Sequence, residues 1–404
     1  MINNIRKMKL LFLMSILIYS LFSCINNKNE TTESSEIIKN NRLNLKINGG
    51  LDNLLQVDSI FKDIEAIPLE TRNECLITSI TKALFYKDKI LLHDNAARLL
   101  VFNINGKFLY EIGKQGRGPG EFSELRDFDL DKDGNVYILD YLKIHKYKID
   151  GAYIKSFSFH YSLELCYPLQ FAVINDNDSY IWGGSFGIRD NSKGNIFAMY
   201  EMEGGKIIKR YFPVKYNIVG SSRQFTHFGD LILIDPIFGS NIIYSINNGK
   251  VAERYFIDFG KKTLDISVPE GFNSLGDFKA RIDNNYFHTI YGFTETENWI
   301  YFKFVNKHHL YNVYYSKELK KSFLSMQWPL PSSRIAPWQI LDSYKDCFIA
   351  FIDPKYVIGQ IDNCKKMEIN TLPEFEKKNI SRLGQLKITD NPIFFMCSTK
   401  TFKQ

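Results

Sequence analysis

Cysteine is scarce in this sequence, with only 6 residues in 404. Secreted proteins that depend on a disulfide framework usually carry an even and denser set of cysteines. The number that follows Cys24 is odd, which favours buried thiols. A bridge between Cys347 and Cys364 stays open as an alternative, because connectivity does not follow from spacing. The cysteines beyond Cys24 are Cys75, Cys166, Cys347, Cys364 and Cys397.

The chain also lacks a run of basic residues, although its formal net charge is +6. Its 51 Lys and Arg residues are interspersed with 45 Asp and Glu residues. Three of the basic residues, Arg6, Lys7 and Lys9, lie in a segment that we expect to be removed. Nucleic-acid binding needs a clustered basic surface, so we expect no nucleic-acid partner.

Two short motifs of common metal sites are absent too, namely H-E-x-x-H and C-x-x-C. His308 and His309 are adjacent, so on a strand they face opposite sides and cannot bind one ion together. The sequence therefore predicts no catalytic residue and no cofactor.

A long apolar run occurs at the N-terminus, where Leu10–Phe22 follows the positively charged Met1–Lys9. It is too short to span a bilayer as a mature helix, and residues 1–23 are typical of a signal peptide. The run ends Leu21-Phe22-Ser23-Cys24, which resembles the processing box of bacterial lipoproteins. The resemblance implies that Cys24 becomes the first mature residue and carries a lipid. An ordinary signal peptide with a chance cysteine, or an uncleaved anchor, is the alternative.

Residues 24–45 are polar and show no periodicity, which predicts a flexible tether. Ile25, directly after Cys24, is not the acidic residue that retains many lipoproteins in the inner membrane. By this family analogy we expect a lipid anchor in the outer membrane, with the protein facing either the periplasm or the surface. We expect a monomer.

Aromatic residues are abundant after the tether, and the chain holds 32 Phe and 23 Tyr. They favour strands that pack ring against ring. Short apolar strands recur at a spacing of roughly 45 to 70 residues, which indicates a β-propeller. We predict an all-β, six-bladed β-propeller in one domain, residues 46–404, with each strand at the opening of a unit. The strands are Ile90–Asp94, Val136–Asp140, Tyr180–Trp182, Leu231–Asp235, Trp299–Phe302 and Phe348–Asp353.

A hairpin turn follows most of these strands. Asn105-Gly106 is the clearest, because an Asn-Gly pair supplies the positive φ angles that a two-residue hairpin needs. The sixth unit continues less regularly, through Tyr356-Val357-Ile358. The other turns are Asp150-Gly151, Gly204-Gly205, Asn248-Gly249 and Lys317-Glu318.

Two further strands, within Phe61–Glu70 and Asn391–Cys397, have no unit of their own. A propeller must close its ring or leave an edge that can pair with another chain. We therefore predict that these strands, one from each terminus, complete the last sheet together.

Three segments carry a family resemblance: Ile64–Glu70, Ile112–Phe122 and Asn391–Ile393. Behind a lipoprotein signal, they resemble the six-bladed β-propeller lipoproteins of Gram-negative bacteria, with blades similar to NHL-type repeats. The resemblance covers most of the mature chain and implies the fold and an envelope location. It implies no common reaction, so no catalytic residue is transferred.

The glycine-rich connector has two interpretations. Successive backbone N–H groups can cradle an anion, but the segment lacks a Gly-Lys-Ser/Thr ending and leads into Phe122 instead of a helix. We favour a crossing between blades, in which glycine permits tight turns and Glu121 accepts hydrogen bonds from loop amides. Its residues are Gly113, Gly116, Arg117, Gly118, Pro119, Gly120 and Glu121.

A weak calcium candidate follows, because the acids of Asp129–Asp140 imitate the ligand spacing of a calcium loop. Its ligands would be Asp129, Asp131, Asp133 and Asp140. The flanks are strands instead of helices, and an Asp-x-Asp-Gly-Asn turn is also ordinary hairpin chemistry. We favour the hairpin.

Two classes of function remain. We favour a non-enzymatic binding or scaffold lipoprotein that holds a peptide, glycan or protein partner at the mouth of the central channel. The alternative is a metal-dependent hydrolase, lactonase or lyase with its site in that channel. The sequence does not determine the ligand.

Overall fold

The computed structural model describes a single body within the chain. Its described residues are 37–39, 42–48, 60–141, 143–158, 168–183, 194–214, 224–236, 240–264, 286–307, 309–326, 340–366, 370 and 372–402.

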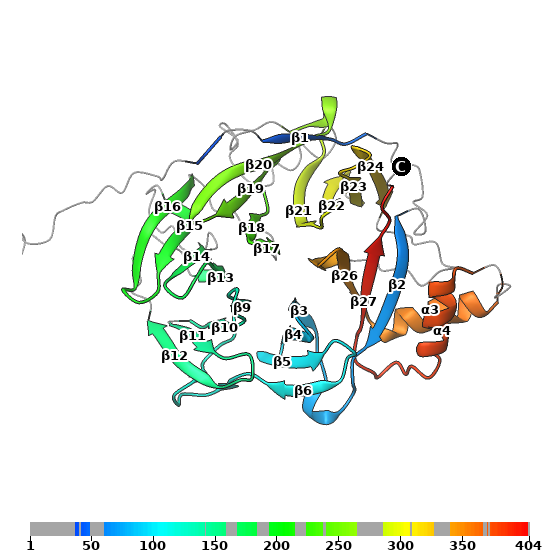
Figure 1. The fold of residues 1–404 in the computed structure, drawn as a ribbon, viewed down its shortest axis with the longest axis horizontal. Coiled ribbons are helices and arrows are strands. Elements are labelled where there is room, and N and C mark those ends of the chain that lie inside the picture. The colour runs from blue at the N-terminus through cyan, green and yellow to red at the C-terminus, as the bar shows by residue number, and fades with distance from the viewer. Residues whose placement is uncertain are drawn as a thin grey trace, which may run out of the picture. The chain divides into compact units, whose positions relative to one another are not determined.

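Within these residues, six antiparallel sheets of four strands surround a common centre (Figure 1). The all-β, six-bladed β-propeller is therefore confirmed. Blade 1 is β3 (Ile80–Tyr86), β4 (Lys89–Asp94), β5 (Arg98–Asn103) and β6 (Phe108–Glu111), and blade 2 is β9 (Asp127–Leu130), β10 (Val136–Leu139), β11 (Lys143–Tyr147) and β12 (Tyr153–Ser158). Blade 3 is β13 (Pro168–Val173), β14 (Asp178–Gly183), β15 (Gly194–Glu201) and β16 (Lys206–Val214), and blade 4 is β17 (Phe225–Phe228), β18 (Leu231–Ile234), β19 (Ile242–Asn247) and β20 (Lys250–Asp258). Blade 5 is β21 (His288–Glu295), β22 (Trp299–Asn306), β23 (His309–Ser316) and β24 (Lys321–Met326), and blade 6 is β25 (Ile340–Tyr344), β26 (Cys347–Ile352), β27 (Ile393–Thr399) and β2 (Phe61–Pro68).

The core of the described propeller lies between neighbouring blades. Each blade interface holds its own cluster of buried apolar side chains. Strand β4 illustrates why the second strands contain runs of apolar residues. Ile90 and Leu92 face blade 6, whereas Leu91 faces blade 2. A strand covered on both faces cannot alternate apolar with polar residues. Full burial of each such side chain contributes about 1.5–3 kcal/mol.

The apolar strands found in the sequence are second, not first, in their blades. Strand β4, for example, is preceded by β3, and β10 by β9. The first strands lie innermost around the centre (Figure 1). Because they line a polar channel, charged residues such as Lys82, Asp127 and Asp129 interrupt their apolar pattern. The first strands were missed for this reason.

The turn at Asn105-Gly106 differs from the two-residue hairpin predicted. Asn103 N–H donates to Lys107 O (2.8 Å) and Gly106 N–H donates to Asn103 O (2.9 Å), so the loop has three residues. Only Gly106, at φ +85°, takes the left-handed conformation in this turn. In contrast, Asn248 (φ +47°) and Gly249 (φ +71°) form the predicted two-residue turn.

Strands from both ends of the chain close the ring, as predicted. Strand β2 pairs antiparallel with β27, with Ile64 opposite Cys397 and Pro68 opposite Ile393. The last sheet therefore has the order β2-β27-β26-β25. This pairing makes the described blades one closed domain.

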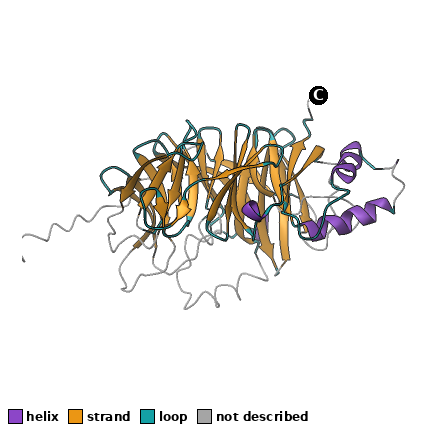
Figure 2. Cartoon of the chain, turned by 90° about the horizontal axis from the view of Figure 1, so that it is seen from below, coloured by secondary structure: helices purple, strands orange, loops and turns teal. Residues whose placement is uncertain are grey.

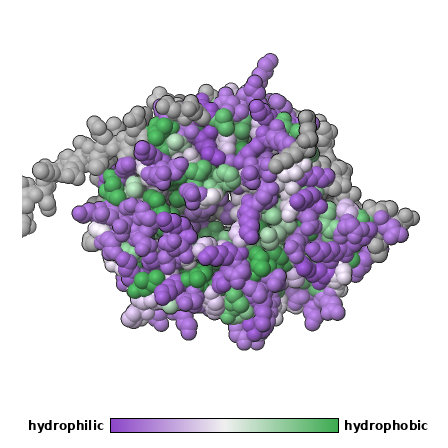
Figure 3. All heavy atoms as spheres, in the orientation of Figure 1, coloured by the Kyte–Doolittle hydropathy of each residue, from purple (hydrophilic) through white to green (hydrophobic). Residues whose placement is uncertain are grey.

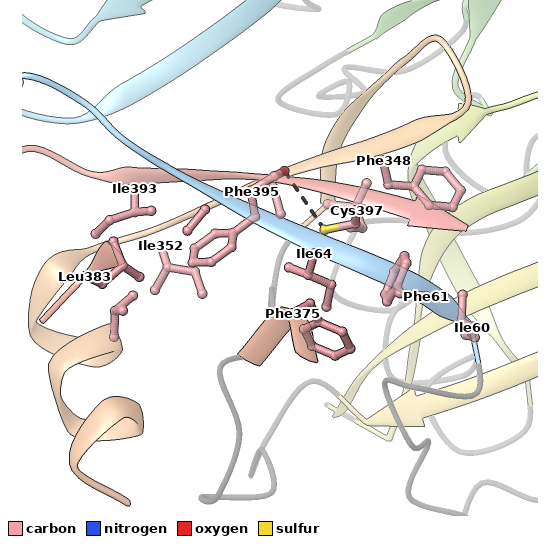
Figure 4. Close-up of a cluster of buried hydrophobic side chains, with 14 of the residues drawn as sticks. Ile60, Phe61, Ile64, Phe348, Ile352, Phe375, Leu383, Ile393, Phe395 and Cys397 are labelled. Atoms are coloured by element: carbon pink, nitrogen blue, oxygen red, sulfur yellow. Dashed lines mark hydrogen bonds between the residues drawn. The ribbon is translucent and has the colours of Figure 1, made fainter. Parts of the chain in front are cut away.

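Two helices between β26 and β27 depart from the all-β pattern: α3 (Pro354–Lys365) and α4 (Glu374–Arg382). They lie beside blade 6 (Figures 1 and 2). The irregular segment predicted at Tyr356-Val357-Ile358 is part of α3. Its signal was Asp353-Pro354, because Asp353 accepts from Lys355 N–H as the N-cap and proline occupies the first turn. In Figure 4, Phe375 of α4 lies beside Ile64 of β2 within a buried cluster.

Two outer sheet edges are covered. Asn379 of α4 accepts from Ala66 N–H (3.0 Å) and donates to Ile64 O (2.6 Å), so its amide pairs with the free edge of β2. Strand β1 (Leu43–Lys46) pairs in parallel with β20 as a fifth strand of blade 4. The tether predicted over residues 24–45 therefore overlaps the propeller. Its boundary was misplaced because Leu43 and Leu45 form too short an alternation to stand out.

The remaining described elements are short. They are β7 (Lys114–Gln115), β8 (Glu121–Phe122) and the 3₁₀ turns η2 (Asn73–Cys75) and η3 (Gly260–Lys262). None of the helices in the described ranges has the length and apolar character needed to cross a membrane. Cys75, Cys347, Cys364 and Cys397 are free thiols, so the Cys347–Cys364 bridge is not formed. Cys24 and Cys166 lie outside the described residues.

Candidate functional site

A cavity of about 1020 Å³ lies at one mouth of the central channel. Most of its wall is built where first strands end and turn into second strands, in blades 1, 2, 3, 4 and 6. Met199 of β15 and the β19–β20 turn at Ile246–Gly249 complete it. Figure 3 shows that hydrophilic side chains cover much of one face of the ring, with apolar patches between them. Lining residues include Tyr86, Asp129, Val173, His227, Asn248 and Asp342.

A cross-channel contact forms part of the cavity wall. His227 Nε2 on β17 lies 2.9 Å from Asp129 Oδ1 on β9, so the contact joins blade 4 to blade 2. Asp129 Oδ2 also accepts from Val173 N–H of the intervening blade 3 (2.8 Å). The Asp129 side chain is 1% exposed, whereas 34% of the His227 side chain is accessible. The imidazole is therefore held by a buried carboxylate and presented to the cavity.

A second ion pair lies two residues earlier on β9 and joins this strand to β3 of blade 1. Lys82 Nζ donates to Asp127 Oδ1 (2.9 Å) and to Phe128 O (2.6 Å). Asp127 Oδ2 accepts from Phe171 N–H of blade 3 (3.0 Å). Both side chains are buried, so the channel contains a layer of paired charge beneath the cavity.

The pKa directions follow from burial set against these partners. Burial opposes the charged form of His227, but the Asp129 carboxylate outweighs it and raises the pKa of His227. Burial would also raise the pKa of Asp129, yet the charge and hydrogen bond of His227 lower it. For Asp127 burial dominates and raises the pKa, although Lys82 opposes it. The Asp129–His227 contact is therefore favoured as an ion pair.

On the opposite wall, Asp342 and Ser343 of blade 6 are hydrogen-bonded to residues of blade 5 that do not line the cavity. The Thr294 hydroxyl lies 3.0 Å from Ser343 Oγ and 3.3 Å from Asp342 Oδ1. Ser343 Oγ donates to Glu295 O (2.8 Å). Together the walls offer carboxylates, an imidazole and amides, which can hydrogen-bond a polar ligand.

The four calcium-candidate carboxylates do not converge. Asp131 Oδ1 accepts from Asp133 N–H (3.0 Å) and Asn135 N–H (2.8 Å), while Asp140 lies beyond the far end of β10. Asp133 is exposed in the turn, and Asp129 bonds His227. Four strand residues span about 13 Å, several times a calcium–oxygen bond. Among the described residues, no three His, Cys, Asp or Glu side chains are placed to hold a metal ion.

Lys146 supplies the positive charge beside Asp131. Its Nζ donates to Asp176 Oδ1 (2.5 Å) and lies 4.0 Å from Asp131 Oδ2. The Tyr137 hydroxyl bridges the same two acids, at 3.1 Å from Asp131 and 2.9 Å from Asp176. This cluster joins the turns of blades 2 and 3, which is a structural role.

The glycine-rich connector crosses from β6 of blade 1 to β9 of blade 2. Gly118 N–H donates to Glu121 Oε2 (2.8 Å), and the Gly120 carbonyl accepts from the Tyr147 hydroxyl (2.8 Å). Gly113 and Gly120 have φ angles of +67° and +74°. A β-carbon on Gly113 would lie 2.8 Å from the Phe122 ring, so the segment folds against its own blades. Gly116 lies against Glu121, whereas Arg117 and Pro119 are exposed.

A Ser–His–Asp arrangement occurs in blade 2. Ser156 Oγ lies 2.8 Å from His145 Nδ1, and His145 Nε2 lies 3.4 Å from Asp140 Oδ2. However, His145 is only 2% exposed, which leaves no access for a substrate. Asp140 also accepts from Ser123 N–H and Glu124 N–H (both 3.0 Å), so it anchors the connector. We assign this group a structural role.

Comparison with known families is decisive for the classification. The model of the family described as "Domain of unknown function (DUF4934)" matches residues 42–398. This chain belongs to the DUF4934 family. No curated protein matches the sequence.

Solved structures share the fold of this DUF4934 chain. A Bacteroides fragilis NCTC 9343 protein that its name describes as exported is 18% identical, with a TM-score of 0.67 over 89% of this chain and 100% of its own. The extracellular domain of a protein named as a one-component system of B. thetaiotaomicron is 13% identical over 67% of this chain and 32% of its own. Its TM-score is 0.35.

The sequence did not reveal the cavity residues of this DUF4934 chain. Asp129 and His227 are 98 positions apart, and only the ring brings them together. Asp129 was named as a calcium candidate, whereas His227, Lys82 and Asp342 were not named at all. The available signal was a charged residue within an otherwise apolar first strand, as in Phe225–Phe228.

Proposed function

We propose that this chain is an exported, lipid-anchored binding protein whose ligand occupies the cavity at the channel mouth. The observation that carries the proposal is the cavity of about 1020 Å³, lined from five blades. Its size suits a short peptide segment or an oligosaccharide. The likeness in fold to a protein named as exported supports an envelope location.

Polar groups of the cavity wall suit such a ligand. Asp230 and Asn248 lie in turns at the mouth and are exposed. Val173, Ile232 and Ile246 add apolar surface between them. Peptides and sugars combine hydrogen-bonding groups with apolar faces, so this mixture fits both.

Blocking the cavity tests the binding role. Asp230→Trp places a bulky ring at the mouth, whereas Asp133→Trp alters an exposed turn acid that does not line the cavity. A panel of short peptides and oligosaccharides is screened by thermal shift, and each hit is titrated by calorimetry. We expect Asp230→Trp to weaken binding more than tenfold and Asp133→Trp to leave it unchanged. Equal binding by all three chains contradicts a cavity site, and chelator-sensitive turnover of a hit would favour a metal enzyme instead.

The lipid is proposed on Cys24, with the outer membrane as its destination. Labelled palmitate added to cells should enter the natural chain and be absent from Cys24→Ala. Incorporation into both chains contradicts the assignment of Cys24. Fractionation of the two membranes then tests the destination.

A further inference from the structure

We propose that the outer rim of blades 3 and 4 is a membrane-docking surface that fits anionic phospholipid. The rim is defined by residues 37–39 and 42–48 and by β16. It rests on the proposed lipid anchor for its biological setting, although its charge and shape can be tested without that anchor. Figure 1 shows β16, β20 and β1 along the outside of these blades.

The two parts of the rim meet at Ile37. The Ile37 side chain packs against the cluster that contains Tyr211 of β16 and Val251 of β20. The N-terminal segment and β16 therefore lie next to each other on the outside of blades 3 and 4.

The charge of the rim complements an anionic surface. Residues 37–48 and 206–214 contain no Asp or Glu. Lys39, Lys46, Lys206 and Lys209 are exposed, and none forms an ion pair with another described residue.

The acids of the neighbouring strand β20 are already engaged. Glu253 pairs with Arg42 (3.0 Å). Asp258 accepts from Gly260 N–H (2.8 Å) and the Thr263 hydroxyl (3.2 Å). Asp258 keeps its negative charge, because both of its donors are neutral. The six Lys and Arg residues of the rim still outnumber the two acids of β20, so the net charge of this surface is positive.

Exposed apolar side chains lie among these lysines. Leu43 is 62% exposed, Ile38 40% and Ile208 44%. Apolar residues beside basic ones are the combination that peripheral proteins use at the headgroup boundary. A membrane surface satisfies both, because lysines meet phosphates while the short apolar chains enter the interface.

Vesicle sedimentation tests the rim independently of the anchor. Residues 35–404 form one compact unit that contains the described blades and both closing strands, so this chain is used without residues 1–34. The vesicles are phosphatidylcholine alone, or phosphatidylcholine with phosphatidylglycerol. The rim variant carries Lys39→Glu, Lys46→Glu and Lys209→Glu. The control variant carries Lys114→Glu, Lys355→Glu and Lys387→Glu, which change the net charge equally at exposed sites elsewhere.

We expect the unchanged chain to bind the anionic vesicles more tightly than the neutral ones. Each lysine near an anionic surface contributes about fivefold in affinity. Loss of three lysines alone corresponds to about 100-fold, and the three added carboxylates weaken binding further. The rim variant should therefore bind at least about 100-fold more weakly, while the control variant binds as the unchanged chain does. Equal losses in both variants, or no preference for anionic vesicles, would overturn the proposal. Circular dichroism melting confirms that both variants fold, and Lys→Gln replacements at the same positions give a second, milder set. Failure of the anchor is recognised separately, by palmitate labelling of Cys24.

Discussion

The contact between the blade 1 hairpin and the closing strand β2 can be tested at Gly106, because Gly151 provides a matched control. Gly106 (φ +85°) and Gly151 (φ +90°) occupy the same position in three-residue hairpin loops. A β-carbon on Gly106 would lie 2.2 Å from the carbonyl oxygen of Pro68, at the end of β2. At Gly151 the nearest atom would be 3.8 Å away. The two sites share their backbone strain and differ in the clash.

Alanine at either position should cost about 1 kcal/mol for the left-handed backbone. At Gly106 the β5–β6 hairpin must also move away from β2, which adds about 1–3 kcal/mol by comparison with overpacked cores. The same movement weakens the hydrogen bond from Glu70 N–H to Gly106 O (2.8 Å). We therefore expect Gly106→Ala to lose about 2–4 kcal/mol and Gly151→Ala about 1 kcal/mol.

Urea denaturation followed by tryptophan fluorescence measures both free energies of unfolding. The difference between the two variants isolates the contact between blade 1 and the closing strand. If the two alanine variants lose the same stability, within about 0.5 kcal/mol, blade 1 does not press against β2 as the structure shows.

Three further predictions concern charge. The buried Glu295 carboxylate accepts hydrogen bonds from Arg254 (2.8 Å), Lys317 (2.5 Å) and Tyr255 (2.7 Å). Glu295→Gln should therefore lower the free energy of unfolding by about 3 kcal/mol in urea denaturation, whereas Glu203→Gln, at an exposed ion pair, should lower it by under about 1 kcal/mol. Similar losses in the two variants would contradict the burial argument. The raised pKa of His227 means that its pairing stabilises the fold fully below its ordinary pKa and is lost as pH rises through the raised value. His227→Gln should therefore destabilise more at pH about 6 than at pH about 9, and a pH-independent loss would refute the ion pair. Calcium or chelator should leave the melting temperature unchanged, and a rise of several degrees with calcium would instead establish the calcium site.

The sequence predicted the architecture because its strongest patterns come from the core. Second strands such as Ile90–Asp94 are buried on both faces, so they appear as apolar runs at the spacing of blades. The closing strands were also recognisable, since Phe61–Pro68 combines Phe61, Ile64 and Ile67 with charged residues and has no hairpin partner nearby. These features depend on local composition alone.

The site could not be predicted in the same way. Its walls come from first strands, in which Asp129 and His227 lie in four-residue segments that have no distinctive pattern. Their contact depends on the curvature of the ring, which brings blade 2 and blade 4 together at the channel. The turn at Gly106 shows a related limit, because Asn-Gly is compatible with two loop lengths and the packing against Pro68 accompanies the longer one.

Direct observation of a bound ligand tests the central claim, that the channel mouth is the binding site. A peptide or oligosaccharide hit from the thermal-shift panel would be crystallised with the protein at saturating concentration. We predict electron density for the hit between His227 and Asp342, inside the cavity. Density on the outer surface of the blades, with the cavity holding only solvent, would contradict the account.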